Sequence, residues 1–175
     1  MRRFLCAVLL IANASFAAFG QAPVTRNDDR TQSQVAIEKL MGSVAEVWNR
    51  HDVVAFSMLF AEDADFTNWR GDLRAHGREE IRREHAEAFA GMFNRSRLTV
   101  VSTRIRFFSS DVAAVQCEWE LVGTIDYDGK GTIPPRTYFP LLIVTRAGGN
   151  WSIAVMHNVL FQPLPPGAIV GPVKQ

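Results

Sequence analysis

The spacing of the apolar residues changes at Arg97, and this change constrains the fold more than any other feature of the sequence. Before Arg97, apolar side chains recur every three or four residues, which is the period of a helix with one buried face. From Arg97 onwards the period is two, which indicates strands with one buried and one wet face. The chain therefore places its helices first and its strands last, which predicts an α+β domain.

Three helices are predicted before the strands. Thr31 precedes the first, over residues 32–50, and forms a capping box with Gln34. Asp52 is suited to cap a second, shorter helix. The third is predicted over residues 78–93, where apolar side chains again share one stripe.

Four strand candidates follow, over residues 97–107, 112–125, 136–146 and 151–161. The turns between successive candidates predict an antiparallel meander. In the second candidate, odd positions are apolar and even ones are Gln116, Glu118 and Glu120, so one face is buried and the other meets water. Three helices packed on a strongly curved sheet leave a cavity between the layers, where ligands usually bind.

Residues 1–22 have the pattern of an export signal. Two arginines precede an apolar, Ala-rich run, and the small residues that follow predict cleavage after Ala22, with Gly20 as the alternative site. The run is short for a membrane span, although an uncleaved anchor is the other interpretation. We expect a periplasmic or secreted protein with no membrane contact after cleavage. The remaining chain divides into a flexible arm over 23–30, a folded domain over 31–162 and a Pro/Gly-rich tail over 163–175.

Charge, cysteines and motifs narrow the possible partners. Cleavage leaves 175 − 22 = 153 residues, and the loss of Arg2 and Arg3 changes the net charge from +1 to −1, without the basic surface that binds nucleic acid. Cys117 is then the only cysteine, so the domain depends on its core and not on a disulfide. No phosphate-binding loop, dinucleotide motif or metal-ligand spacing occurs, so we expect neither cofactor nor metal.

One stretch resembles a known family. Residues 61–81, AEDADFTNWRGDLRAHGREEI, are similar to a signature of the nuclear transport factor 2-like superfamily, which includes SnoaL-like and ketosteroid-isomerase-like domains. The segment GGNWSI and the later His157 and Asn158 resemble the last strand of SgcJ/EcaC-type members. The resemblance covers about residues 33–161. It implies a cone-shaped fold with three N-terminal helices on a curved antiparallel sheet, commonly dimerised through the open sheet face.

Departures from the family pattern argue against steroid-isomerase chemistry. The first strand of those isomerases carries a general-base aspartate, and the matching position here is Asn68, whose amide does not take up a proton at pH 7. The oxyanion-hole tyrosine would fall near Val44, and the protonated aspartate near Leu141 or Leu142. Residues 129–175 contain no Asp or Glu, so the last two strands supply no carboxylate.

Two histidines are candidates for cofactor-independent acid–base chemistry in the cavity. His157 is in phase with Trp151, Ile153 and Val155 on the final strand and is the leading candidate for a general base, with a core position or the other sheet face as the alternative. His85 lies on the apolar stripe of the third helix, where a histidine more often belongs to the core. The pair would resemble the cavity histidines of some dehydratases of the superfamily.

We expect the cavity to bind a small, mostly apolar molecule, with acid–base chemistry of the isomerase, dehydratase or hydrolase type as an extension. Asn68 could bond that ligand, or it could simply bond its own backbone. The other candidate ligand-binding residues are Phe66, Trp119, Phe89 and Met92. The alternative function is a non-catalytic module whose open sheet face forms a homodimer or docks a partner.

Overall fold

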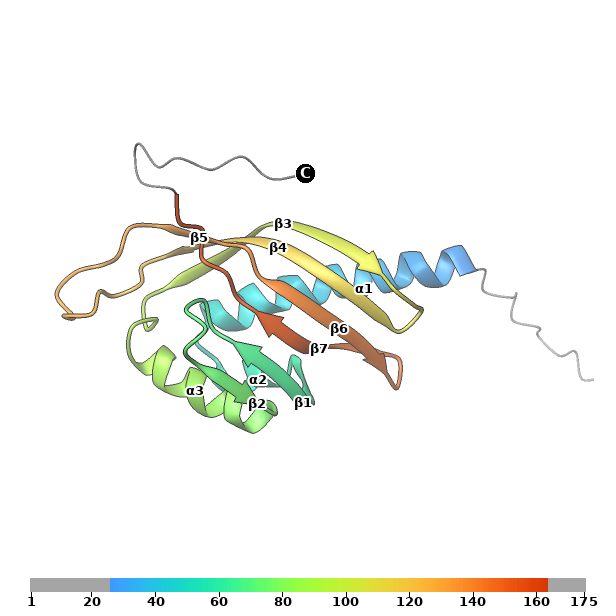
Figure 1. Ribbon diagram of the computed structural model, residues 1–175, viewed down its shortest axis with the longest axis horizontal. Coiled ribbons are helices and arrows are strands. Elements are labelled where there is room, and N and C mark those ends of the chain that lie inside the picture. Colours follow the sequence, from blue (N-terminus) through green and yellow to red (C-terminus); the bar gives the residue numbers. More distant parts are fainter. Residues whose placement is uncertain (1–25, 164–175) are drawn as a thin grey trace, which may run out of the picture.

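The computed structural model describes residues 26–163 and shows an α+β domain in which three helices lie on one side of a curved, open sheet (Figure 1). This architecture confirms the predicted fold class. The predicted leader, residues 23–25 of the arm and residues 164–175 of the tail lie outside the described residues. Within residues 26–163, none of the helices combines the length and the apolar composition needed to cross a membrane.

Helix α1 (Arg26–Asn49) begins earlier than predicted. Thr31 and Gln34 therefore lie inside the helix, and the predicted capping box is wrong. Residues 26–30, which we expected in a flexible arm, are also helical. The predicted apolar stripe is correct: Ile37 and Met41 are almost fully buried against the sheet.

The end of α1 is locally determined. His51 adopts a left-handed conformation with φ 52°, and two backbone N–H groups bond back to carbonyls in the last turn of α1. The next residue, Asp52, caps helix α2 (Val53–Ser57), as predicted: its Oδ1 accepts a hydrogen bond from the Ala55 N–H at 2.9 Å. The chain thus passes from α1 to α2 without a long loop. Phe56 of α2 is consequently buried in the core between the helices and the sheet.

The Gly-Arg-Glu segment of the family signature has a structural role. Gly77 precedes α3 with φ 81°, its N–H donates to the Ala64 carbonyl at 2.8 Å, and a Cβ there would lie 3.3 Å from the Glu62 oxygen. Arg78 then donates to the Phe60 carbonyl at 2.7 Å. These contacts fix α3 against the first hairpin. The elements concerned are β1 (Phe60–Thr67), β2 (Arg74–His76) and α3 (Arg78–Ala90).

The remaining strands are β3 (Arg97–Phe107), β4 (Val112–Val122), β5 (Arg136–Tyr138), β6 (Leu141–Ala147) and β7 (Asn150–His157). The sheet order is β2-β1-β7-β6-β4-β3, with β5 beside β4. Strands β3, β4, β6 and β7 form the predicted antiparallel meander, whereas β1 joins β7 in parallel. The predicted strand 136–146 is divided at Pro140, and α3, β4 and β7 end before their predicted boundaries.

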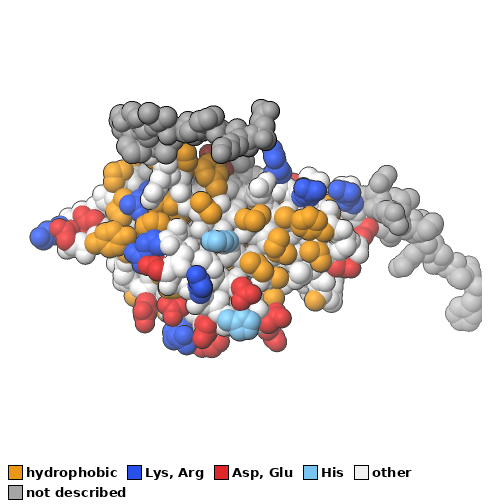
Figure 2. Space-filling model, in the orientation of Figure 1, with side chains coloured by type: hydrophobic (Ala, Val, Ile, Leu, Met, Phe, Trp, Pro, Cys, Tyr) orange, Lys and Arg blue, Asp and Glu red, His pale blue; other side chains and the backbone are white. Residues whose placement is uncertain are grey.

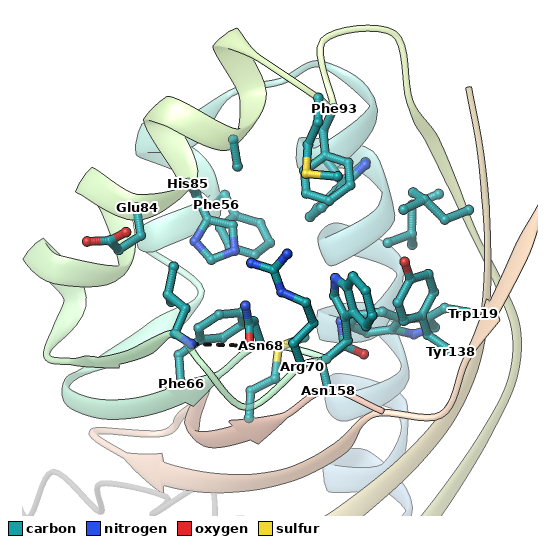
Figure 3. Close-up of a pocket in the computed structure, with 18 residues that line it drawn as sticks. Phe56, Phe66, Asn68, Arg70, Glu84, His85, Phe93, Trp119, Tyr138 and Asn158 are labelled. Atoms are coloured by element: carbon teal, nitrogen blue, oxygen red, sulfur yellow. Dashed lines mark hydrogen bonds between the residues drawn. The ribbon is translucent and has the colours of Figure 1, made fainter. Parts of the chain in front are cut away.

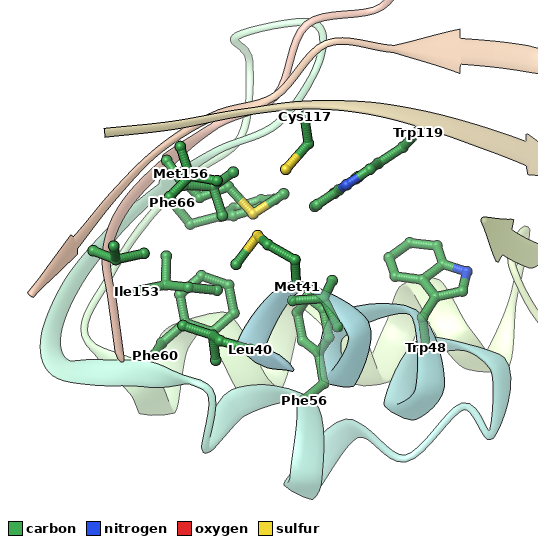
Figure 4. Close-up of a cluster of buried hydrophobic side chains, with 14 of the residues drawn as sticks. Leu40, Met41, Trp48, Phe56, Phe60, Phe66, Cys117, Trp119, Ile153 and Met156 are labelled. Atoms are coloured by element: carbon green, nitrogen blue, oxygen red, sulfur yellow. The ribbon is translucent and has the colours of Figure 1, made fainter. Parts of the chain in front are cut away.

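The core lies between the helices and the inner face of the sheet. Strand β4 alternates as predicted, so that Cys117, Trp119 and Leu121 point inward and are at most 4% exposed. Figure 4 shows side chains of α1 and α2 facing Cys117 and Trp119, with side chains of β1 and β7 beside them. A series of aromatic rings runs through this core, with 6.0 Å between the centroids of Trp48 and Phe56 and 5.4 Å between those of Phe56 and Phe60.

Candidate functional site

A cavity of about 170 Å³ lies between the helices and the inner sheet face (Figure 3). Its walls come from all three helices, the β1–β2 turn, β4, β5 and the end of β7. Aromatic rings supply much of the lining, among them Trp48, Phe56, Phe66, Phe93 and Trp119. The sequence therefore predicted correctly that the fold holds a mostly apolar cavity, and four of the candidate residues that it named for ligand contact line it.

These four are Phe66, Asn68, Met92 and Trp119. The fifth, Phe89, does not line the cavity. Its ring packs edge-on against Trp48, with 4.9 Å between ring centroids, and lies behind the cavity wall in the core. The helical stripe alone could not distinguish the two positions, because the lining and the core behind it occupy the same face of α3.

His85 is the histidine that the structure places in the cavity. Its Nδ1 lies 2.8 Å from the Ile81 carbonyl oxygen, one turn earlier on α3. A carbonyl oxygen only accepts hydrogen bonds, so Nδ1 carries the proton and Nε2 of the neutral ring holds a lone pair. Nε2 has no hydrogen-bond partner among the described residues.

The surroundings of His85 keep its ring neutral. The rings of Phe56 and Phe66 lie 4.5 Å and 4.8 Å from it, between ring centroids. Burial lowers the pKa of His85 to about 4, and the hydrogen bond to Ile81 opposes this shift only in part. At neutral pH, the cavity therefore contains an uncharged imidazole with one free acceptor.

Asn68 lies at the cavity but directs its amide into the β1–β2 turn. Its Oδ1 accepts from the Gly71 N–H at 2.9 Å, and its Nδ2 donates to the Asp72 carboxylate at 2.8 Å. This bond is the main reason that the pKa of Asp72 is lowered. The backbone-bonding interpretation of Asn68 is thus the one that the geometry shows.

His157 is not in the cavity, and its expected position there is wrong. It lies exposed on the outer sheet face, between Thr67 of β1 and Leu141 of β6. An irregularity in the pairing of β7 with β6 interrupts the alternation after Ile153, so that Met156 is the next buried residue. The phase that we extrapolated from Trp151 is therefore lost, and the two histidines do not form a pair.

Several residues of the cavity were not predicted. Tyr138 on β5 and Asn158 after β7 line the sheet side, while Trp69 and Arg70 come from the β1–β2 turn. The guanidinium groups of Arg70 and Arg136 lie over the Trp69 ring, 5.4 Å and 5.5 Å from its centroid. Only the folded strands bring these segments together, although the aromatic and polar residues within residues 61–81 were a partial signal.

The described part of the chain shows neither an activated cysteine nucleophile nor a metal-binding cluster. Burial raises the pKa of the Cys117 thiol, which disfavours a nucleophilic thiolate. Residues 29–163 bring together no cluster of three His, Cys, Asp or Glu side chains suited to a metal ion. The absence of a cofactor or metal stays a prediction from the sequence.

A family model described as "SnoaL-like domain" matches residues 43–153. No curated protein sequence matches the chain significantly. A domain of unknown function with a cystatin-like fold from Nostoc punctiforme is 27% identical, with a TM-score of 0.66 over 77% of this chain and 80% of the other. These matches agree with the resemblance in residues 61–81.

Two further solved structures share the fold at lower identity. The hexachlorocyclohexane dehydrochlorinase LinA-type3 from Novosphingobium barchaimii is 18% identical, with a TM-score of 0.69 over 83% of this chain and 99% of that one. A putative scytalone dehydratase from Novosphingobium aromaticivorans is 16% identical, with a TM-score of 0.67 over 85% and 99%. At these identities the likeness shows the fold alone.

Proposed function

Since the chain belongs to the SnoaL-like domain family, we propose that its cavity binds one small, mostly apolar molecule of about one ring. The observation that carries this proposal is the cavity itself, about 170 Å³ with a largely aromatic wall. An apolar cavity of roughly 150 Å³ is large enough to hold benzene. A four-ring steroid exceeds this space, which adds to the argument against steroid-isomerase chemistry.

Ligand binding is tested with toluene as the probe and a four-ring steroid as the oversized control. A ligand that binds only the folded state stabilises it by about 2.7 kcal/mol at a hundredfold excess over Kd. We expect toluene to raise the free energy of unfolding and the steroid to leave it unchanged. Unchanged stability with toluene up to its solubility limit would count against the proposal.

A pair of variants on α3 locates the binding site. Ala88 lines the cavity, whereas Ala90 is exposed on the same helix. Ala88→Phe fills the cavity without removing a polar group and is expected to abolish toluene binding. Ala90→Phe adds the same ring outside the cavity and is expected to retain toluene binding. Equal affinities in the two variants would place the ligand elsewhere.

A second candidate function is proton abstraction by His85 within this cavity. It is favoured by the neutral imidazole whose Nε2 is unpartnered. Two structural neighbours are named as a dehydrochlorinase and a putative dehydratase, and both reactions involve removal of a proton by a base. Because burial disfavours the imidazolium form, this chemistry needs a substrate whose developing negative charge stays near His85.

Nitrobenzisoxazole tests this base, because its ring opens to a coloured phenolate when a base removes its carbon-bound proton. We expect turnover that His85→Gln abolishes and that His157→Gln, on the outer sheet face, leaves unchanged. The rate should fall as pH drops through about 4, where His85 becomes protonated. Turnover that survives in His85→Gln would exclude His85 as the base.

We also propose a homodimer through the outer sheet face. Figure 2 shows apolar side chains gathered over β6 and β7, and these include Leu141 (43% exposed) and Val155 (38% exposed). The pairing row through Val155 has His76 and Asp65 at one end and Arg106 at the other. Two copies in opposite directions would therefore bring Asp65 of one copy near Arg106 of the other. Light scattering should report a dimer that Leu141→Asp dissociates. Val54→Asp, at an exposed apolar residue of α2, is the matched control.

Export is a separate proposal, and it rests on the N-terminal pattern. Residues 1–22 lie outside the described residues, so the pattern alone supports it. Mass spectrometry of the protein recovered from the periplasm or medium should give a chain that begins at Pro23. A start at Gln21 would indicate cleavage after Gly20, and an intact N-terminus would favour the uncleaved anchor.

A further inference from the structure

On the sheet side of the cavity, two fully buried polar atoms, Trp119 Nε1 and Asn158 Oδ1, have no hydrogen-bond partner among the described residues. Both residues line the cavity, and both atoms are shielded from bulk water. The indole N–H is a donor only and the amide oxygen is an acceptor only. Since buried polar atoms are nearly always hydrogen-bonded, an unpaired donor and an unpaired acceptor in one cavity indicate groups that a ligand satisfies.

Within residues 26–163, neither atom has a hydrogen-bond partner of normal geometry. Trp119 is on the inward face of β4 and 2% exposed; its N–H influences the nearby Cys117 thiol, whose pKa it partly lowers, but makes no hydrogen bond of normal geometry. Asn158 is held by its backbone, whose N–H donates to the Thr67 carbonyl at 3.0 Å. This bond fixes the backbone at the end of β7 and leaves the side-chain oxygen free.

A third polar group lies on the same side of the cavity. Figure 3 shows Tyr138 with Trp119 and Asn158 on the sheet side, and His85 on the helix side. Burial raises the pKa of the Tyr138 phenol, and Arg136 opposes this in part, so the hydroxyl stays neutral at pH 7. The sheet side therefore carries neutral hydrogen-bonding groups, while the remaining lining is mostly apolar, with Asn68, Arg70, Glu84 and His85 as its polar members.

Resting on the proposed small-molecule function, we propose that the ligand is a neutral ring with one polar substituent that both accepts and donates a hydrogen bond, such as a carboxamide or a hydroxyl group. The substituent accepts from Trp119 Nε1 and donates to Asn158 Oδ1, and the ring occupies the aromatic part of the cavity. An ionised carboxylate only accepts, so it would face the Asn158 oxygen without a proton between them. A plain hydrocarbon would leave both atoms unpaired.

Three probes of the same ring size separate these cases: toluene, benzamide and benzoate. Calorimetric titration of the full chain should give a benzamide affinity about tenfold above that of toluene, because two net hydrogen bonds are added. Benzoate should bind no better than toluene. Equal affinities for benzamide and toluene, or tightest binding of benzoate, would overturn this inference while small-molecule binding stands. If none of the three binds, both proposals fail.

Variants test which atoms give benzamide its higher affinity than toluene. Trp119→Phe keeps an aromatic ring but lacks the N–H, and Asn158→Leu keeps the volume but lacks the oxygen. Each should reduce the ratio of benzamide to toluene affinity severalfold towards one. Trp151→Phe, at a tryptophan that packs on Phe107 and does not line the cavity, should leave the ratio unchanged. If Trp119→Phe weakens both probes equally, Trp119 contributes packing only, and the assignment is wrong.

Discussion

The two faces of the sheet are built from the same strands, yet they treat polar groups in opposite ways. On the outer face, His76 Nδ1 lies 2.9 Å from an Asp65 carboxylate oxygen, and Arg70 near the rim pairs with Asp72. On the inner side, His85 Nε2 and the Trp119 N–H have no hydrogen-bond partner in the part of the chain that the structure describes. The Asp65–His76 pair is exposed to water, whereas the Trp119 N–H is shielded from it and still unpaired. This contrast supports the proposal that the cavity binds a ligand.

The largest expected effect compares two neighbouring leucines of β6. Leu142 is fully buried and Leu141 is 43% exposed. Leu142→Ala should lower the free energy of unfolding by about 2–5 kcal/mol because it leaves a hole in the core. Leu141→Ala should change it by no more than about 0.5 kcal/mol at low protein concentration. Urea denaturation measures both.

The same pair also tests the proposed dimer. A loss of stability in Leu141→Ala that grows with protein concentration would show that a second copy covers the outer face. Similar losses in the two variants at every concentration would contradict the assignment of Leu142 to the core and Leu141 to the surface.

The second effect is the pH dependence of the free energy of unfolding that His85 confers. Its pKa is 6.5 in the unfolded chain and about 4 in the folded one, so the unfolded state binds more protons between these values. The contribution of His85 to stability is therefore fully present above pH 6.5 and is lost as pH falls through about 4. The loss between pH 7 and pH 4 amounts to about 3 kcal/mol.

His85→Leu removes this titration, so the measurement is the difference in unfolding free energy between wild type and variant at each pH. We expect the wild type to lose its advantage as pH falls from 7 to 4. A difference that does not change with pH would mean that His85 titrates normally and is not desolvated in the folded protein.

The sequence predicted the helices and strands around the cavity better than the side chains that line it. The apolar stripe of α1 and the alternation of β4 follow from local periodicity, and Asp52 caps α2 through a contact three residues along the chain. His157 was misplaced because one irregularity in β7 reverses which side chains face inward. Both Val155 and Met156 are apolar, so composition gave no sign of the shift.

Other parts of the site depend on contacts between distant segments. Tyr138 is on a three-residue strand whose place beside β4 is visible only in the folded sheet. Asn158 follows β7 and reaches the cavity because its backbone bonds to β1. Whether a polar side chain is satisfied depends on all of its neighbours in space, so the unpaired atoms of the cavity could not be recognised from residue types or spacing.

The third effect concerns Asn68, at the rim between the two faces. Asn68→Ala removes the acceptor for the Gly71 N–H and the donor to Asp72, and should cost about 1 kcal/mol of stability. Asn94→Ala is the control, since the Asn94 amide makes only a 3.5 Å contact with the Ala90 carbonyl. If Asn68→Ala keeps its stability but loses affinity for benzamide, Asn68 serves the ligand and not the turn.

The smallest effect, and the sharpest contrast with His85, is expected at His76. The hydrogen bond with Asp65 is the main reason that its pKa is raised above 6.5, so its stabilising contribution is present below pH 6.5 and is lost as pH rises through the folded-state pKa. Because both side chains are exposed, we expect a change in stability too small for denaturation curves. NMR titration of the imidazole resonances resolves it: His76 should titrate above 6.5 and His85 near 4, and Asp65→Asn should lower the pKa of His76 alone. Similar pKa values for the two rings would remove the distinction between the inner and outer faces.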